Sequence, residues 1–158
     1  MGKEKPKYKL IDYDEKYDPK LIEVIFDAYQ DIPEYGEPTQ KKAQKYLNWL
    51  KNHSTFFKIM LVGNRVAGFI AADTEWKKKD SEKVGEIHEL SIRKEFWGKG
   101  LGHILLDEAL KYFKKMGIKK VRLWVGEKNK SAIEFYKKHG FKETGKTHLG
   151  WVRMEKRL

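Results

Sequence analysis

A strand, a glycine-spaced turn and a long helix follow one another without interruption between residues 86 and 110. The segment EIHELSI (86–92) has the composition of a strand, glycine occupies every second position at Gly98, Gly100 and Gly102, and helical periodicity follows. This order leaves unpaired backbone N–H groups at a helix N-terminus, where the helix dipole also favours an anion. The stretch therefore predicts a phosphate or pyrophosphate site, and a nucleotide-type cofactor is the first hypothesis.

Two common phosphate-binding loops fit this chain poorly. The segment GFKETGKT (140–147) formally matches a Walker A loop, but it follows a predicted helix and nothing after it resembles a helix start. The dinucleotide fingerprint G-x-G-x-x-G fails because His103 occupies the position of its third glycine. We interpret the first match as chance and exclude the second.

Two segments together resemble the GNAT superfamily of N-acetyltransferases. WGKGLG (97–102) is similar to that family's acetyl-CoA loop, [RQ]-x-x-G-x-[GA], and NKSAIEFYKKHGF (129–141) is similar to its downstream segment N-x-x-A-x-x-[FL]-Y-x-x-x-G-F. The resemblance covers residues 55–158 well and the N-terminal part in layout only. Trp97 departs from the pattern, since Arg or Gln is usual there, and it could cover the phosphates or pack under the loop.

The resemblance implies acetyl-CoA as the cofactor and backbone N–H groups of residues 98–102 as its pyrophosphate site. It also implies that the strand ending at Leu90–Ile92 splays from the strand Val121–Val125. The pantetheine arm would lie in that gap, bonded to the backbone at Leu90 and Ile92, with the Leu90 N–H as oxyanion donor. The implied cofactor-binding residues are Leu90, Ser91, Ile92, Trp97, Gly98, Lys99, Gly100, Leu101, Gly102, Asn129, Ala132 and Tyr136.

Tyr136 is the general acid that the resemblance implies, because it matches a tyrosine near the cofactor sulfur. A phenol with a pKa of about 10 can protonate a departing thiolate, whose thiol has a pKa of about 8.5. The same residue also fits the buried stripe of a helix. Asn129 is expected at or beside the N-cap of that helix and, by resemblance, near the cofactor arm.

The general base stays open among Glu86, His88 and Glu89, which precede the glycine turn. Strand alternation places Glu86 and His88 on one face and Glu89 on the other, unless a bulge near Leu90 reverses the facing. His88-Glu89 also begins an H-E-x-x-H motif, but position 92 is Ile, so we expect no metal. The chain has no cysteine, which favours direct attack in a ternary complex over a cysteine acyl-enzyme.

The acceptor is expected to be a primary amine. By resemblance its pocket is built from residues 26–40 and 144–151, and the first segment is acidic and aromatic, which suits a cationic amine or a peptide N-terminus. A small polyamine-like molecule, a protein N-terminus and a lysine all stay open. The alternative from another class is a non-catalytic acyl-CoA-binding or RNA-binding protein on the same fold. The acidic and aromatic residues concerned are Asp27, Asp31, Glu34, Tyr35 and Glu37.

Composition bounds the class of protein. The net charge of +11 invites a nucleic-acid partner, but lysine pairs at 114–115, 119–120 and 137–138 are better explained as solvated helix faces. Hydrophobic content of 40% over 158 residues predicts one folded domain, residues 1–158. Without an apolar run or a signal-peptide pattern, we expect a cytoplasmic protein with no membrane partner and leave a homodimer possible. Abundant Lys and Glu resemble hyperthermophile composition.

The expected fold is α+β, with a GNAT-like mixed, mostly antiparallel sheet flanked by helices on both faces. Apolar periodicity and turn residues define its elements. The expected strands are Tyr8–Asp12, Phe56–Val62, Val66–Asp73, Glu86–Ile92, Val121–Val125 and one or two in the tail. The expected helices are 18–29, 39–50, 100–116 and 130–139, with a loop at Asp31–Pro38 and a polar connection at Trp76–Lys83.

Overall fold

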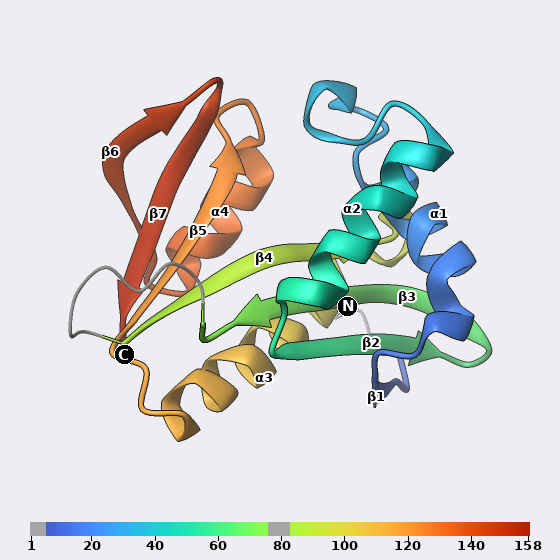
Figure 1. Ribbon diagram of the computed structural model, residues 1–158, viewed down its shortest axis with the longest axis horizontal. Coiled ribbons are helices and arrows are strands. Elements are labelled where there is room, and N and C mark those ends of the chain that lie inside the picture. Colours follow the sequence, from blue (N-terminus) through green and yellow to red (C-terminus); the bar gives the residue numbers. More distant parts are fainter. Residues whose placement is uncertain (1–5, 76–82) are drawn as a thin grey trace, which may run out of the picture.

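The computed structural model describes residues 6–75 and 83–158, and most of the expected polar connection at 76–83 therefore lies outside the described residues. Seven strands form one mixed sheet in the order β1-β2-β3-β4-β5-β7-β6 (Figure 1). All neighbouring strands are antiparallel except β4 and β5, which are parallel. The strands are β1 (Lys9–Asp12), β2 (Phe56–Val62), β3 (Arg65–Asp73), β4 (Val84–Ile92), β5 (Lys120–Gly126), β6 (Lys142–His148) and β7 (Trp151–Arg157).

Helices cover both faces of the sheet, as expected. The helices α1 (Asp18–Ala28) and α2 (Gln40–His53) lie on one face, and α3 (Leu101–Lys115) lies on the other (Figure 1). The fourth helix, α4 (Lys130–Lys138), packs into the same core as α3. The predicted boundaries agree to within a few residues, and the predicted loop at 31–38 contains a short 3₁₀ turn at Pro33–Tyr35.

The apolar stripes of the helices form two cores, one on each side of the sheet. Leu21, Ile25 and Leu47 of α1 and α2 pack on the first side, and Leu105 and Phe113 of α3 pack on the second. All five side chains are almost completely buried. Each such burial contributes roughly 1.5–3 kcal/mol, so these stripes fix the helices against the sheet.

A bulge in β4 overturns the facing expected from simple alternation. Glu89 pairs with Ala71 and Ile87 pairs with Ala72, so His88 is an extra residue between two consecutive partners on β3. The extra residue shifts the alternation by one, as bulges do. Glu86, His88 and Glu89 consequently all line the same cavity, so simple alternation fails here and the reversal by a bulge near Leu90, which the sequence left open, is what the structure has.

The parallel ladder between β4 and β5 is short. It runs from Val84↔Lys120 to Ile87↔Leu123, although β4 continues to Ile92 and β5 continues to Gly126. Beyond Ile87 the described strands leave the β5-side edge of β4 without a ladder partner, as the expected splay requires. The gap between the two strands therefore lies beside the last residues of β4. Leu90 is one of these residues, and it lines two cavities.

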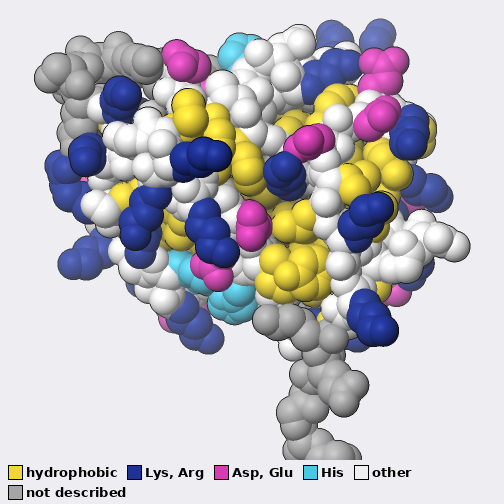
Figure 2. Space-filling model, turned by 90° about the horizontal axis from the view of Figure 1, so that it is seen from below, with side chains coloured by type: hydrophobic (Ala, Val, Ile, Leu, Met, Phe, Trp, Pro, Cys, Tyr) yellow, Lys and Arg dark blue, Asp and Glu magenta, His cyan; other side chains and the backbone are white. Residues whose placement is uncertain are grey.

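The positive charge is dispersed on the face formed by α3. Figure 2 views the molecule from this side and shows Lys and Arg side chains scattered among acidic and hydrophobic ones. Such an arrangement is typical of solvated helix surfaces. None of the helices in the described ranges combines the length and apolar character that a membrane span needs.

Candidate active site

A cavity of about 680 Å³ lies where β4, the glycine turn, α3 and α4 converge. Its floor is the end of β4, its rim is the glycine turn, and the first turn of α4 closes it. Eleven of the twelve residues expected to bind the cofactor line this cavity. They are Leu90, Ser91, Ile92, Trp97, Gly98, Gly100, Leu101, Gly102, Asn129, Ala132 and Tyr136, whereas Lys99 is not among the lining residues.

The N-terminus of α3 presents backbone donors to this cavity. Gly98 and Gly100 have φ angles of 75° and 77°, a left-handed conformation that glycine adopts without strain. Gly100 is the N-cap of α3, and no described side chain caps this end of the helix. The first N–H groups of α3 are therefore available to an anion, and the helix dipole favours one there.

Trp97 ties the glycine turn to the end of β4. Its indole Nε1 donates a hydrogen bond of 2.8 Å to the Ile92 carbonyl, while the ring remains 44% exposed. This contact fixes the entrance of the turn in place of the usual Arg or Gln. It also occupies one lone pair of a carbonyl that the family resemblance assigns to the pantetheine arm.

A second cavity, of about 600 Å³, lies between the α1–α2 side and the strands β5, β6 and β7. Both segments expected to build the acceptor pocket contribute to it. The first supplies Tyr35 and Glu37, and the second supplies Lys146, His148 and Trp151. The Tyr35 hydroxyl accepts a hydrogen bond from the Lys128 N–H (3.1 Å) and donates to the Gly150 carbonyl (3.3 Å), which holds the α1–α2 loop across the cavity.

Two other acidic residues of the α1–α2 region stabilise the approach to the glycine turn. The Asp27 carboxylate accepts a hydrogen bond from the Lys94 N–H, and Asp31 forms an ion pair with the Lys94 side chain. Glu34 is exposed and does not line the acceptor cavity. Of the acidic residues considered in this segment, only Glu37 reaches that cavity.

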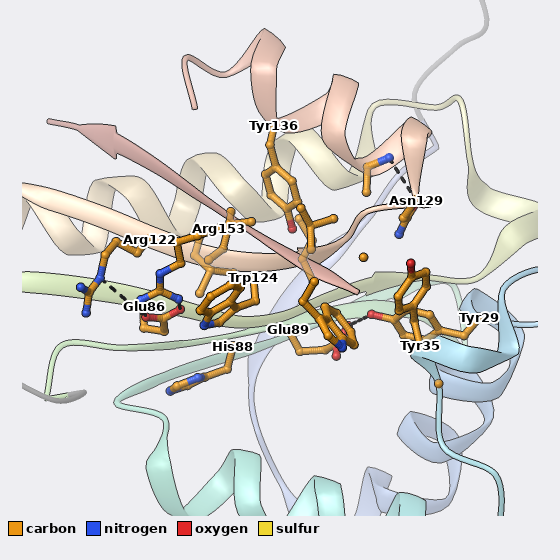
Figure 3. A pocket seen from close by; sticks show the side chains of 18 of the residues that line it. Tyr29, Tyr35, Glu86, His88, Glu89, Arg122, Trp124, Asn129, Tyr136 and Arg153 are labelled. Carbon is orange, nitrogen blue, oxygen red and sulfur yellow. Dashed lines mark hydrogen bonds and ion pairs between the residues drawn. The ribbon is translucent and has the colours of Figure 1, made fainter. Parts of the chain in front are cut away.

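Tyr136 lies where the two cavities meet. It projects from α4, is 8% exposed, and lines both cavities together with Tyr29, Leu90, Asn129 and Ala132. Figure 3 shows its hydroxyl directed into the cavity, and no hydroxyl partner is found among the described residues. Burial raises the pKa of the Tyr136 phenol well above its ordinary value, and the negative charge of Glu89 raises it further. Tyr136 is therefore a protonated, unengaged donor.

Asn129 has the predicted place at the start of α4. Its side-chain oxygen accepts a hydrogen bond of 3.3 Å from the Ala132 N–H, which makes it the N-cap of this helix (Figure 3). The cap orients the first turn of α4 toward the cofactor cavity, and Tyr136 follows two turns later.

Glu86 is engaged by arginine. Arg153 of β7 donates two hydrogen bonds to its carboxylate, at 2.7 and 2.8 Å, and Nε of Arg122 lies 3.9 Å away (Figure 3). The side chains of Glu86 and Arg153 are 3% and 8% exposed. A carboxylate held in a bidentate pair is poorly placed to accept a proton, so this geometry disfavours Glu86 as the general base.

His88 is also engaged, by a carboxylate on the neighbouring strand. Its Nε2 lies 3.1 Å from Oδ2 of Asp73, and both side chains are almost fully buried. The ring of Trp49 packs edge-on against the imidazole at 4.8 Å. His88 thus has one nitrogen committed to a structural contact at the margin of the cavity.

Glu89 differs because all its partners are neutral hydroxyl groups. It accepts hydrogen bonds from Tyr46 (2.5 Å), Tyr29 (2.7 Å) and Ser91 (2.6 Å). Burial raises the pKa of both tyrosines, and Glu89 raises it further, so both remain donors. No cation among the described residues pairs with this carboxylate, which lines the acceptor cavity together with Tyr136.

We predict that replacing Gly100 with Ala will weaken acetyl-CoA binding about tenfold, because a left-handed conformation costs a residue with a Cβ about 1–2 kcal/mol. Gly63→Ala is the matched control, since Gly63 has a φ of 60°, open space around it and a position in the β2–β3 hairpin. Calorimetric titration with acetyl-CoA, and with ATP and NAD for comparison, measures the effect. Equal losses of acetyl-CoA affinity in the two variants would show that the glycine turn has no special role in binding the cofactor.

Residues 22–141 match the model of the acetyltransferase (GNAT) family. The chain belongs to this family. This match confirms the resemblance seen in the two sequence motifs. Members of the family use acetyl-CoA as the cofactor. Within the described ranges, no group of three or more His, Cys, Asp or Glu side chains is arranged to hold a metal ion.

Individual relatives agree with this assignment. An N-acetyltransferase of Methanocaldococcus jannaschii that is uncharacterised is 40% identical over 140 residues, which is 87% of this chain and 62% of that protein. A crystal structure of a Pyrococcus horikoshii protein is 37% identical, with a TM-score of 0.84 over 96% of this chain and 99% of the other. The PaiA N-acetyltransferase of Thermoplasma acidophilum, solved with coenzyme A, has the same fold (23% identity, TM-score 0.75, 96% and 99% covered).

Sequence reasoning missed several residues of the site. Tyr29, the C-cap of α1, and Tyr46 of α2 continue the apolar stripes of these helices, where helical periodicity indicates a core residue and gives no sign that a hydroxyl reaches Glu89. Arg122 and Arg153 alternate with apolar residues on β5 and β7, so they resemble solvent-facing positions. Their partner Glu86 lies far away in the chain, and no local pattern connects the three.

Proposed function

We propose that this protein transfers an acetyl group from acetyl-CoA to a primary amine by direct attack in a ternary complex. The amine belongs to a small molecule, a protein N-terminus or a lysine. The observation that carries the proposal is Tyr136, a protonated hydroxyl without a partner in the described structure, at the junction of two cavities. One cavity has the uncapped N-terminus of α3 for a pyrophosphate, and the other has the charge of Glu89 for an amine.

The acetyl thioester supplies an electrophilic carbonyl carbon and a thiolate leaving group. The N–H groups at residues 98–102 bind the pyrophosphate, and the open edge of β4 at Leu90 and Ile92 positions the pantetheine arm. The Leu90 N–H stabilises negative charge that develops on the carbonyl oxygen. These residues place the thioester beside Tyr136 without contributing a covalent bond.

Glu89 and Tyr136 divide the proton transfers between them. Glu89 attracts the ammonium of the acceptor and receives its proton, directly or through water, so that the nitrogen lone pair can attack the carbonyl carbon. As the carbon–sulfur bond breaks, the Tyr136 hydroxyl gives its proton to the departing thiolate. The attacking nitrogen carries one proton more than the amide product and gives it up to solvent as the amide forms. The proton held at Glu89 also leaves to solvent, and Tyr136 takes one proton back from solvent. One net proton is thus released for each acetyl group transferred, and the starting state is restored.

The test is the appearance of both products. Purified protein is mixed with acetyl-CoA and a panel of primary amines, while free thiol is followed and the acceptor is analysed by mass spectrometry. The proposal expects thiol release that depends on the amine and an acceptor that gains one acetyl group. Acetyl-CoA binding without any amine-dependent release would instead support the non-catalytic acyl-CoA-binding alternative.

Glu37 gives the acceptor affinity a pH dependence. Burial raises the pKa of this carboxyl above its ordinary value, and Glu89 adds to the effect against the opposing charge of Lys42. Glu37 is ionised above that pKa and attracts an ammonium. As pH falls through it, that charge is lost, and we expect KM for the amine to rise about two- to fivefold.

The variant Glu37→Gln should have the higher KM already at neutral pH and should lack this acidic rise. The matched control is Glu34→Gln, which removes the same charge from an exposed residue of the same loop outside the cavity. Steady-state rates as a function of pH and amine concentration make the comparison. Identical KM profiles in wild type and Glu37→Gln would remove Glu37 from the acceptor site.

A further inference from the structure

The acceptor cavity is electrostatically polarised between its two walls. On the α1–α2 side and β4, its lining carries the carboxylates of Glu37, Glu86 and Glu89, of which Glu86 is paired with Arg153 across the cavity wall. On the opposite side, the strands β5, β6 and β7 contribute three cations. These cations are Arg122, Lys146 and Arg153.

Only one of the three cations is fully compensated within the lining. Arg153 forms the bidentate pair with Glu86. Arg122 lies 3.9 Å from the same carboxylate, and its Nε is buried without a hydrogen-bond partner in the described structure. Lys146 makes no ion pair with any residue in the described ranges. Glu155 lies opposite Arg122 on β7, but it does not line the cavity.

Aromatic side chains separate the two charged regions. Trp124 of β5 is 40% exposed and carries the Arg153 guanidinium over its ring at 4.8 Å. Trp151 and Tyr35 meet edge to face with ring centroids 4.9 Å apart. An occupant that spans this space lies on apolar ring surface between an anionic end and a cationic end.

We propose that the natural acceptor carries a negatively charged group, such as a carboxylate, at a distance from its reacting amine. The amine lies at Glu89 and Tyr136, and the anion lies toward Arg122 and Lys146, neither of which is hydrogen-bonded to a carboxylate among the described residues. This inference rests on the proposed acetyltransferase function and narrows its acceptor. A polyamine places a second cation against the cationic wall and is the disfavoured class. Both an ω-amino acid and a peptide with an acidic residue after its N-terminus have the required chemistry.

The experiment compares acceptors that differ only in the charge of their far end. The first series is 5-aminopentanoate, pentylamine and 1,5-diaminopentane, which are negative, neutral and positive there. The second is a pair of short peptides that begin Ser-Glu or Ser-Lys and are otherwise identical. We expect kcat/KM to be about tenfold higher for the negative member than for the positive member of the better-used series, since more than one cation contributes. The series with the higher kcat/KM shows whether the anion belongs to a small molecule or to a peptide.

The variant Lys146→Glu places a negative charge on the cationic wall. The ratio of kcat/KM between the negative and positive acceptors should then fall about fivefold. Lys142→Gln is the control, because Lys142 is an exposed lysine on the same strand that does not line the cavity, and its ratio should equal that of wild type.

The outcomes separate the inference from the function on which it rests. A diamine or Ser-Lys peptide that is used as well as, or better than, its acidic counterpart would overturn the inference while leaving acetyl transfer established. Thiol release with none of the acceptors, although acetyl-CoA binds, would overturn both. A preference for the acidic members that Lys146→Glu reduces and Lys142→Gln preserves supports the inference.

Discussion

Replacing Tyr136 with Phe should lower kcat by about 10²- to 10⁴-fold, the usual contribution of a positioned general acid. The acetyl-CoA affinity should change little, because the ring that lines the cofactor cavity is kept. Stability should also be preserved, since the hydroxyl that is removed has no partner in the described part of the chain. Steady-state rates, calorimetric titration and thermal unfolding measure the three quantities.

Tyr112→Phe is the matched control for this experiment. The Tyr112 hydroxyl donates a hydrogen bond of 2.8 Å to Oγ1 of Thr55, and the residue lines neither cavity. Its removal should leave kcat unchanged. If Tyr136→Phe retained the wild-type kcat, Tyr136 would be only a core aromatic, as its helical periodicity alone suggests.

The pKa of Tyr136 also predicts the alkaline behaviour of the enzyme. Because burial and Glu89 raise it above the ordinary value of about 10, the acid stays protonated throughout the working range. Tyr136 should therefore cause no loss of kcat below about pH 10. An alkaline loss below that pH that disappeared in Tyr136→Phe would contradict the assignment.

Replacing Arg153 with Met should produce the largest loss of stability. Arg153 is the bidentate partner of Glu86, and both side chains are almost fully buried, so the variant leaves a buried carboxylate with only the more distant Arg122, at 3.9 Å, as a cation. Removing one partner of a buried pair typically costs about 3–5 kcal/mol of unfolding free energy. For a chain of this size we expect Tm to fall by roughly 10 °C, measured by thermal or denaturant unfolding.

The double variant Glu86→Gln/Arg153→Met tests the cause of this loss. The double variant has no buried carboxylate, and the cation that loses its ion-pair partner, Arg122, is 26% exposed, so the double variant should be more stable than Arg153→Met alone. The single variants Glu86→Gln and Arg153→Met each lose unfolding free energy. If the loss in the double variant equalled the sum of these two losses, packing of Arg153 on Trp124, and not the ion pair, would stabilise this region.

The fold followed from local patterns that the tertiary structure did not override. Helical periodicity identified α1, α2 and α3, and Gly63-Asn64 marked the β2–β3 hairpin. The glycine turn predicted the cavity at α3 because its chemistry is local: closely spaced glycines and a helix N-terminus suffice. Lys99 failed to line that cavity, since a sequence motif cannot tell which side chain of a turn points inward.

The acceptor site was harder to predict from the sequence because it depends on contacts between distant segments. The extra residue at His88 becomes visible only when β4 is paired with β3, and it alone brings Glu89 to the same face as Glu86. The separate roles of these carboxylates come from their partners: hydroxyl groups from α1 and α2 surround Glu89, and an arginine from β7 neutralises Glu86. Strand alternation contains neither piece of information.

The most direct test of the account is the initial rate measured while acetyl-CoA and the acceptor amine are varied together. Direct attack at the junction of the two cavities requires both substrates to be bound at once, so double-reciprocal plots should intersect. The protein incubated with acetyl-CoA alone should also keep its unmodified mass. Parallel lines, together with a protein that gains one acetyl group before the amine is added, would show a covalent acyl-enzyme and contradict the proposed direct transfer at Tyr136 and Glu89.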